Sequence, residues 1–129
     1  MIKDLYIENC VYHSLVVCDM PAKFIPLTHS DYSEYLEAAT GKSFSTEDFR
    51  KIAERIETLI RMFNNREGFT RKDDTMPYRT LNEPLLDGPA KGQFIGEENL
   101  NKMIGEFYAL WGWDASGVPT PETLKRHQL

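Results

Sequence analysis

The clearest periodic pattern in the chain runs from Ser45 to Asn65 and reads STEDFRKIAERIETLIRMFNN. Its apolar positions recur at intervals of three and four: Phe49, Ile52, Ala53, Ile56, Leu59, Ile60 and Phe63. This spacing gives a helix one apolar stripe, and we expect that face to be buried. Ser45 and Asp48 occupy the two positions of a capping box and so define the start of the helix.

Three further segments are predicted helices, from apolar periodicity with a terminal signal or, in the last of them, from a cap and a proline at the first position. They are residues 29–39, residues 97–111 and residues 121–126. Gly41 and Gly112 follow the first two and supply the left-handed stop that often ends a helix. The chain is therefore predicted to be all-α.

The first twenty residues leave two interpretations open. Leu15, Val16, Val17 and Cys18 fit a short buried strand, whereas residues 5–18 also fit a buried helix that runs into a tight bend. The helix and bend are favoured. Residues 69–94 hold prolines and glycines among charges without a sustained period, which predicts a loop.

These elements predict one helical domain over residues 1–129, an orthogonal or irregular multihelical bundle with one long charged loop. Composition narrows the function. A net charge of -5 argues against a general nucleic-acid partner, which needs a basic surface. No apolar run approaches the ~20 residues of a spanning helix, so no membrane association is expected. Two cysteines, Cys10 and Cys18, are too few for a disulfide framework and indicate a reducing, cytoplasmic setting.

Cys18 is the residue on which a chemical role depends most. A lone cysteine after three aliphatic residues is most often an inert, buried small hydrophobe. Its alternative is a thiolate ligand to iron, which needs three more ligands, and the chain offers only Cys10 besides. His13 shares a site with Cys18 only if a turn lies between them. His29 and His127 are interpreted as surface residues.

The run from Asn64 to Arg79 mixes charges of both signs and has two interpretations. One is a solvated loop. The other is an anchored loop, in which Phe69, Met76, Pro77 and Tyr78 pack. Its arginines, Arg66, Arg71 and Arg79, would then pair with Glu67, Asp73 or Asp74, or face an anionic cofactor or a neighbouring domain.

Several of these stretches also carry a resemblance to a known family. They are residues 63–77 (FNNREGFTRKDDTMP), 83–85 (EPL), 88–92 (GPAKG), 107–108 (FY), 112–114 (GWD) and 117–120 (GVPT). In this order, and over nearly the whole chain, they resemble the C-terminal part of the aldehyde:ferredoxin oxidoreductases, the tungsten-pterin enzymes. The resemblance implies a helical C-terminal fragment of a longer oxidoreductase.

The same resemblance implies roles for four residues. In that family the domain carries an Asp-x-x-Gly-Leu-Cys motif that contacts the pterin and supplies the fourth cysteine of a [4Fe–4S] cluster. Residues 13–18 are similar in spacing, which makes Cys18 the implied metal ligand and places His13, Ser14 and Val17 beside the pterin. His13 replaces the aspartate, and Val16 replaces the glycine, which implies a less tight turn.

The resemblance implies no catalytic residue in this chain, since the family's acid–base residues lie in N-terminal domains. Together with those domains it implies a tungsten-bis-pterin enzyme of an anaerobe that oxidises an aldehyde to a carboxylic acid and passes electrons to ferredoxin. The isolated chain is expected to bind no cofactor, and a homo-oligomer is allowed. The rival hypothesis is a non-catalytic helical interaction module or separately encoded subunit derived from that family.

Overall fold

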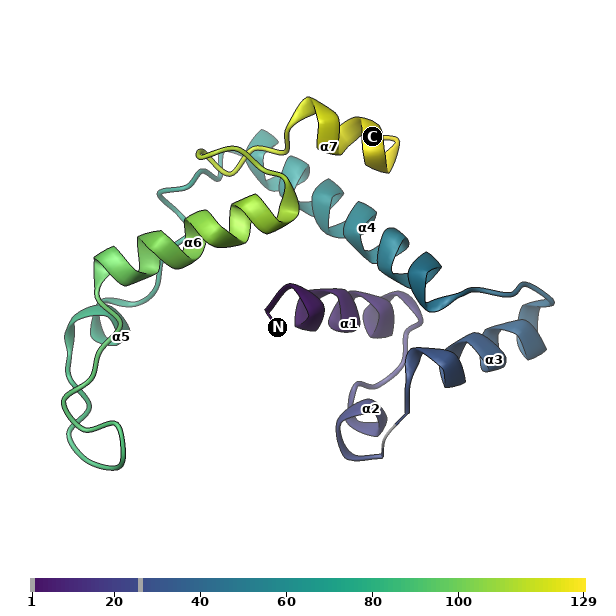
Figure 1. Cartoon of the computed structure of the whole chain (residues 1–129), viewed down its shortest axis with the longest axis horizontal. Helices are drawn as coiled ribbons and strands as arrows, with labels where there is room; N and C mark the ends of the chain where they lie inside the picture. The colour runs from purple at the N-terminus through teal and green to yellow at the C-terminus, as the bar shows by residue number, and fades with distance from the viewer. Residues whose placement is uncertain (1, 26) are drawn as a thin grey trace. The chain divides into compact units, whose positions relative to one another are not determined.

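The computed structural model describes residues 2–25 and 27–129, without the side chains of residues 21 and 22. The elements are all helical (Figure 1), as the periodicity predicted. Their bounds are α1 Ile2–Ser14, α2 Met20–Phe24, α3 His29–Thr40, α4 Thr46–Arg66, α5 Tyr78–Asn82, α6 Glu97–Trp111 and α7 Pro121–His127. An isolated bridge pairs Trp113 with Pro119. The all-α fold class is confirmed.

The predicted caps fix the helix ends. At the start of α4 the Ser45 amide donates to Asp48 Oδ2 at 2.9 Å, and the Asp48 amide donates to Ser45 Oγ at 3.1 Å. This reciprocal pair satisfies amides that the first turn of a helix leaves without partners. Gly41 and Gly112 both have a φ of 71° at the ends of α3 and α6, the left-handed conformation expected of a glycine stop.

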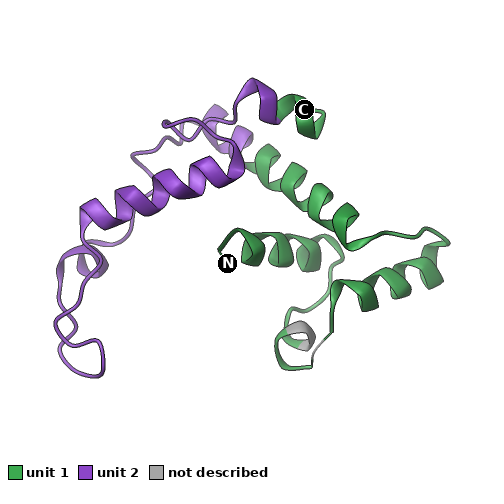
Figure 2. Ribbon diagram, viewed as in Figure 1, with its two compact units in different colours: residues 1–60, 124–129 green, residues 61–123 purple. Residues whose placement is uncertain are grey.

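The chain divides into two compact units (Figure 2). Unit 1 comprises residues 1–60 and 124–129, and unit 2 comprises residues 61–123. The prediction of a single domain stays a prediction. In unit 1, α1 packs on α4: Lys3 Nζ lies 2.8 Å from Glu54 Oε1, and the Cys10 thiol lies 3.9 Å from the Ala53 carbonyl oxygen.

The core of unit 1 is aromatic as well as aliphatic. Its buried apolar side chains come from three helices: Ile7, Cys10, Val11 and Tyr12 of α1, Tyr32 of α3, and Phe49 and Ala53 of α4. The Tyr12 and Tyr32 rings lie 5.5 Å apart between centroids, and the His29 ring lies 5.9 Å from that of Phe49. Tilted ring pairs at these distances add to the stabilisation from burial.

Two predictions for histidines are corrected here. His29 is half-buried within this ring cluster, and its Nε2 atom is shielded from solvent. His127 is only 7% exposed, and its carbonyl accepts a hydrogen bond from Arg55 Nε at 3.0 Å. Burial, with a contribution from Arg126, lowers the pKa of His127. Neither is a surface residue, since both contact side chains of α4. Local sequence does not show such contacts, which is why the prediction was wrong.

Unit 2 has a small core around α6. Its buried side chains include Arg61, Leu81, Tyr108, Trp111 and Thr123. The predicted loop of residues 69–94 contains one short helix, α5, which the sequence did not indicate. Backbone hydrogen bonds organise the rest. The Leu85 amide donates to the Gln93 carbonyl at 3.0 Å, and the Gly92 amide donates back to Leu85 at 2.8 Å.

The apolar stripe of α4 is only partly buried. Phe49 and Ala53 are covered, but four of the predicted positions are about half exposed: Ile52 42%, Leu59 50%, Ile60 47% and Phe63 53%. The helix was predicted correctly and the burial of its whole stripe was not. In the part of the chain that the structure describes, no helix is long and apolar enough to cross a bilayer.

Candidate functional site: the turn that follows α1

The chain leaves α1 through a tight hydrogen-bonded turn. The Val17 amide donates to the Tyr12 carbonyl at 3.1 Å, and the Val16 amide donates to the His13 carbonyl at 3.1 Å. These two bonds define a Schellman motif, which satisfies carbonyls that the last turn of a helix leaves free. The helix-and-bend interpretation of the first twenty residues is therefore confirmed, and the strand alternative is wrong.

Val16 holds the position in this motif that glycine normally occupies. Its φ is 56°, and its side chain is 91% exposed. A β-branched residue in the left-handed region is a conformational outlier that costs about 1–2 kcal/mol. The expectation of a less tight turn is wrong: replacing glycine with valine keeps the tight turn and adds strain to it.

The four residues of the implied site lie at the end of α1 and along this turn. His13 and Ser14 are exposed, although the Ser14 hydroxyl donates to the Cys10 carbonyl at 2.7 Å. Val17 is 37% exposed. Cys18 is exposed and free, whereas Cys10 is free and buried. The interpretation of Cys18 as an inert buried residue is therefore wrong. Cys18 is exposed because the left-handed turn directs the chain away from the core.

Charged groups surround the turn. Lys23 of α2 pairs with Asp19, the residue after Cys18, and this hydrogen bond lowers the pKa of the Asp19 carboxyl, with a smaller contribution from His13. On α4, burial raises the pKa of the half-buried Glu57 carboxyl, and the charge that His13 can carry opposes that effect. His13 is thus placed among acidic groups at one end of α1.

Side chains of the types that bind metal ions were compared for grouping in the part of the chain that the structure describes. Over residues 2–25 and 27–129, no three histidine, cysteine, aspartate or glutamate side chains are grouped so that they could hold a metal ion. A turn does lie between His13 and Cys18, which meets the condition for a shared site.

The charged run after α4 is organised by a residue that the sequence analysis missed. Arg61 of α4 is 8% exposed. Its guanidinium forms a bidentate pair with Asp74, at 2.9 Å from Nη1 to Oδ1 and 2.7 Å from Nη2 to Oδ2. Its Nε donates to the Gly117 carbonyl at 2.7 Å. Tyr108 donates its hydroxyl to the same carboxylate.

Aromatic rings enclose this pair. The Arg61 guanidinium carbon lies 5.3 Å from the Tyr108 ring centroid and 5.2 Å from that of Trp113, within the range of cation–π attraction. Burial alone would raise the pKa of Asp74, but the hydrogen bonds from Arg61 and Tyr108 outweigh it and lower that pKa. We call Arg61, Asp74, Tyr108, Trp113 and Gly117 the Arg61 cluster.

The predicted anchors of the run are corrected accordingly. Phe69, Met76 and Tyr78 are 56%, 41% and 74% exposed and do not pack as a core. Arg66 pairs with its neighbour Glu67, Arg79 pairs with Glu83 of the next turn, and Arg71 donates to the Asn101 carbonyl at 3.0 Å. The run is anchored, but through an arginine on the preceding helix. The only signal for this was that Arg61 lies one helical turn before the run.

The fold and the turn define an all-α domain that presents one exposed cysteine next to a strained bend. The family model described as aldehyde ferredoxin oxidoreductase, domains 2 and 3, matches residues 1–129. The chain belongs to this family and corresponds to a C-terminal part of it.

Individual relatives agree with this assignment. The tungsten-containing aldehyde ferredoxin oxidoreductase of Pyrococcus abyssi (strain GE5 / Orsay) is 44% identical over 96 residues, which is 74% of this chain and 15% of that protein. The protein of the same name from Pyrococcus furiosus (strain ATCC 43587 / DSM 3638 / JCM 8422 / Vc1) is 42% identical over 96 residues, with the same coverage of 74% and 15%. This chain thus spans about 15% of the length of these curated relatives.

A solved structure is also similar. It is a chain of the active site complex BamBC of benzoyl coenzyme A reductase in complex with 1,5-dienoyl-CoA. The two chains are 32% identical with a TM-score of 0.63, over 81% of this chain and 14% of that one. The likeness therefore extends across both units of this chain in sequence as well as in fold.

Proposed function

We propose that this chain works as the helical part of a tungsten-pterin, iron–sulfur enzyme that oxidises an aldehyde to a carboxylic acid. The observation that supports this most directly is the exposed Cys18 thiol on the turn after α1, in a member of the aldehyde ferredoxin oxidoreductase family. A thiolate ligand must reach outward to a group that the chain cannot complete alone. An exposed cysteine on a hydrogen-bonded turn meets that need.

The residues of this turn fit the role of a single-ligand contributor. The Schellman hydrogen bonds fix the backbone immediately before Cys18. The thiol would therefore lose little conformational entropy when a partner domain binds. The Asp19–Lys23 pair holds the next residue against α2. In the intact enzyme the cluster would carry electrons and the tungsten-pterin would supply the two-electron oxidation.

The neighbouring side chains would act on the pterin. His13 is exposed and can donate a ring N–H where the family motif has an acceptor carboxylate, so it would contact a different atom of the cofactor. The Ser14 hydroxyl already donates to Cys10 and retains its acceptor capacity. Val17 adds an apolar contact. The remaining domains, a ferredoxin and a cytoplasmic anaerobic setting complete the proposal.

The test uses a preparation that contains this chain together with the remainder of its enzyme. Cys18→Ser should lower iron content and remove the reduced-minus-oxidised absorbance of the cluster. The matched control is Cys10→Ser, since Cys10 is the other free cysteine and is buried. Unchanged iron in Cys18→Ser, or equal losses in both variants, would eliminate the ligand role.

One observation favours a second candidate, a non-catalytic module that binds another protein. Val16, Met20 and Phe24 are 91%, 53% and 74% exposed around the same turn, and exposed apolar side chains in a group are typical of a binding surface. Metal and pterin content of the enzyme preparation separates the two functions. A stable assembly without tungsten or iron would favour the module.

A further inference from the structure

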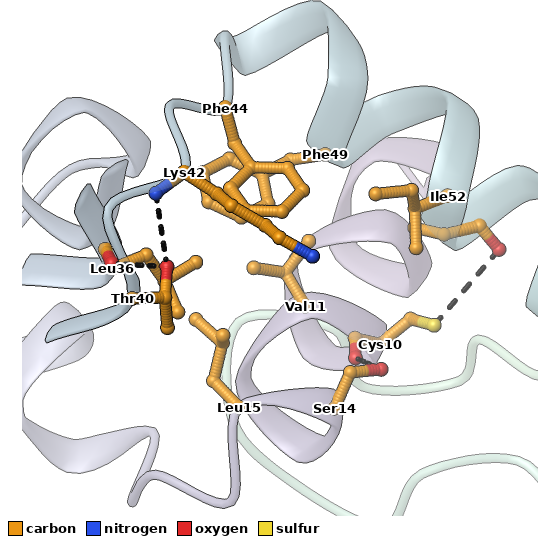
Figure 3. A pocket seen from close by; sticks show the side chains of 11 residues that line it. Cys10, Val11, Ser14, Leu15, Leu36, Thr40, Lys42, Phe44, Phe49 and Ile52 are labelled. Carbon is orange, nitrogen blue, oxygen red and sulfur yellow. Dashed lines mark hydrogen bonds between the residues drawn. The ribbon is translucent and has the colours of Figure 1, made fainter. Parts of the chain in front are cut away.

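Unit 1 contains an apolar pocket that none of the residues of the Arg61 cluster touches. Its volume is about 360 Å³, which is near the lower end of the range for small-molecule sites. Figure 3 shows its lining, which comes from α1 and the turn that follows it, from α3 and α4, and from the connection between those two helices: Cys10, Val11, Ser14, Leu15, Leu36, Thr40, Lys42, Phe44, Phe49, Ile52 and Ala53.

The floor of the pocket is buried and uncharged. Cys10, Val11, Phe49 and Ala53 are between 1% and 5% exposed. The Cys10 thiol faces the Ala53 carbonyl, and burial, followed by the nearby charge of Glu57, raises the pKa of that thiol. Cys10 is therefore a neutral thiol at physiological pH. A floor of this composition accepts a hydrocarbon chain and excludes a charged head group.

The rim has a different chemistry. Lys42 lies on the connection between α3 and α4, and its side chain extends over the pocket (Figure 3). Ser14 and Thr40 also lie at the rim, but their hydroxyls already donate to the carbonyls of Cys10 and Leu36, at 2.7 and 2.6 Å. Within the described residues the Lys42 ammonium has no hydrogen bond or ion pair. It is the donor left for a ligand.

We propose that this pocket binds a straight-chain aliphatic carboxylate, with its tail on the floor and its carboxylate on the Lys42 ammonium. A neutral lipid would leave the ammonium without a partner, and a small inorganic anion would leave the apolar floor empty. A single hydrocarbon chain with one terminal negative charge satisfies both regions. The proposal concerns unit 1 of this chain by itself and does not depend on the proposed oxidoreductase function.

The test compares two probes on the 129-residue chain, octanoate and 1-octanol, which share a tail and differ in charge. Methyl NMR signals of Val11, Leu15 and Leu36 should shift saturably with each probe. Octanoate should bind about fivefold more tightly, because a partly exposed ion pair contributes roughly 1 kcal/mol. Equal affinities, or no saturable shifts, would overturn the proposal.

Two pairs of variants locate the binding. Lys42→Met keeps the apolar stem and removes the charge, and should weaken octanoate about fivefold while leaving 1-octanol unchanged. Lys51→Met, an exposed lysine of α4 outside the lining, is its control. Ile52→Trp should fill the pocket and abolish the shifts from both probes, whereas Leu59→Trp, on the same helix and 50% exposed, should not. Octanoate binding that survives Ile52→Trp, or that Lys51→Met weakens as much as Lys42→Met, contradicts the assignment.

Discussion

Two segments carry the chain away from the end of a helix: the run from Asn64 to Arg79 and the turn from His13 to Asp19. They differ in how their polar groups find hydrogen-bond partners. The run is rich in charges, and its key carboxylate, Asp74, is held by a buried arginine and a tyrosine hydroxyl. The turn keeps Val16 in a left-handed conformation and leaves the Cys18 thiol exposed, and its one carboxylate, Asp19, pairs with Lys23 at the surface.

This contrast reverses the usual association of charge with function. Charged groups that are fully paired inside a unit specify and rigidify structure. An exposed thiol near a strained residue does not stabilise the unit in this way. Backbone strain of this kind is concentrated at functional positions. The run is therefore the structural element of this chain, and the turn is the candidate functional one.

The largest effect is expected from Arg61→Met, which tests whether buried pairing holds the run in place. This change removes both arginine hydrogen bonds from Asp74, which keeps only Tyr108, and leaves the Gly117 carbonyl without its donor, so we expect unit 2 to lose about 3 kcal/mol of stability. Urea unfolding followed by tryptophan fluorescence reports it, because both tryptophans, Trp111 and Trp113, lie in unit 2.

Arg66→Met is the control for that experiment. The Arg66 side chain is 71% exposed in its pair with Glu67, so its replacement should change stability by less than about 0.5 kcal/mol. Similar losses in both variants would mean that the Arg61 cluster is not what holds the run.

Gly117→Ala should have the next largest effect. A Cβ at Gly117 would lie 2.2 Å from Arg61 Nη2 and 2.7 Å from Tyr108, at a φ of 78°. The clash and the left-handed backbone together should destabilise unit 2 by about 2 kcal/mol or more, again measured by tryptophan fluorescence in urea. Gly88→Ala, with a φ of 81° and nothing within 4 Å, should lose only about 1 kcal/mol. Equal losses would show that backbone strain alone is responsible.

Val16→Gly tests the other side of the comparison. Glycine removes about 1–2 kcal/mol of left-handed strain but gives the unfolded chain more freedom, so the net gain should be about 0.5–1 kcal/mol. Hydrogen exchange of the residue 17 amide, which donates to the Tyr12 carbonyl, should slow accordingly. Val17→Gly, one position on, should accelerate exchange instead. No gain in Val16→Gly would mean that the turn is not strained.

The smallest expected effect concerns Glu57, near His13. Its folded pKa is raised, so its contribution to stability is complete below the unfolded pKa of about 4.3 and is lost as pH rises through the folded pKa. Glu57→Gln should therefore stabilise unit 1 by a few tenths of a kcal/mol at pH 7, and the gain should vanish near pH 4. Asp74 has the opposite sign, since its pKa is lowered.

Glu47→Gln is the control for Glu57→Gln. Glu47 lies in the first turn of α4, where a negative charge is favourable, so its neutralisation should be slightly destabilising at pH 7. Helix melting by circular dichroism at the two pH values measures both variants. A gain for Glu57→Gln that is equal at pH 4 and pH 7 would exclude a titrating carboxylate as its cause.

The helices α3, α4, α6 and α7 could be predicted from local sequence, because caps and apolar periodicity act between neighbouring residues. It also carried the family resemblance and the place of Cys18 next to a turn. It did not show that Ile52, Leu59, Ile60 and Phe63 stay exposed, since burial depends on which other elements cover a helix.

Which side chains form pairs and which stay exposed depends on contacts between residues that lie far apart in the chain. Arg61 meets Asp74, Tyr108 and Gly117 across separations of 13, 47 and 56 residues, and no local pattern encodes such distances. His127 became a buried residue for the same reason, and Val16 took a conformation that its own side chain disfavours. Backbone preferences are set between near neighbours, whereas desolvation and ion pairing are set by whatever the folded chain brings together.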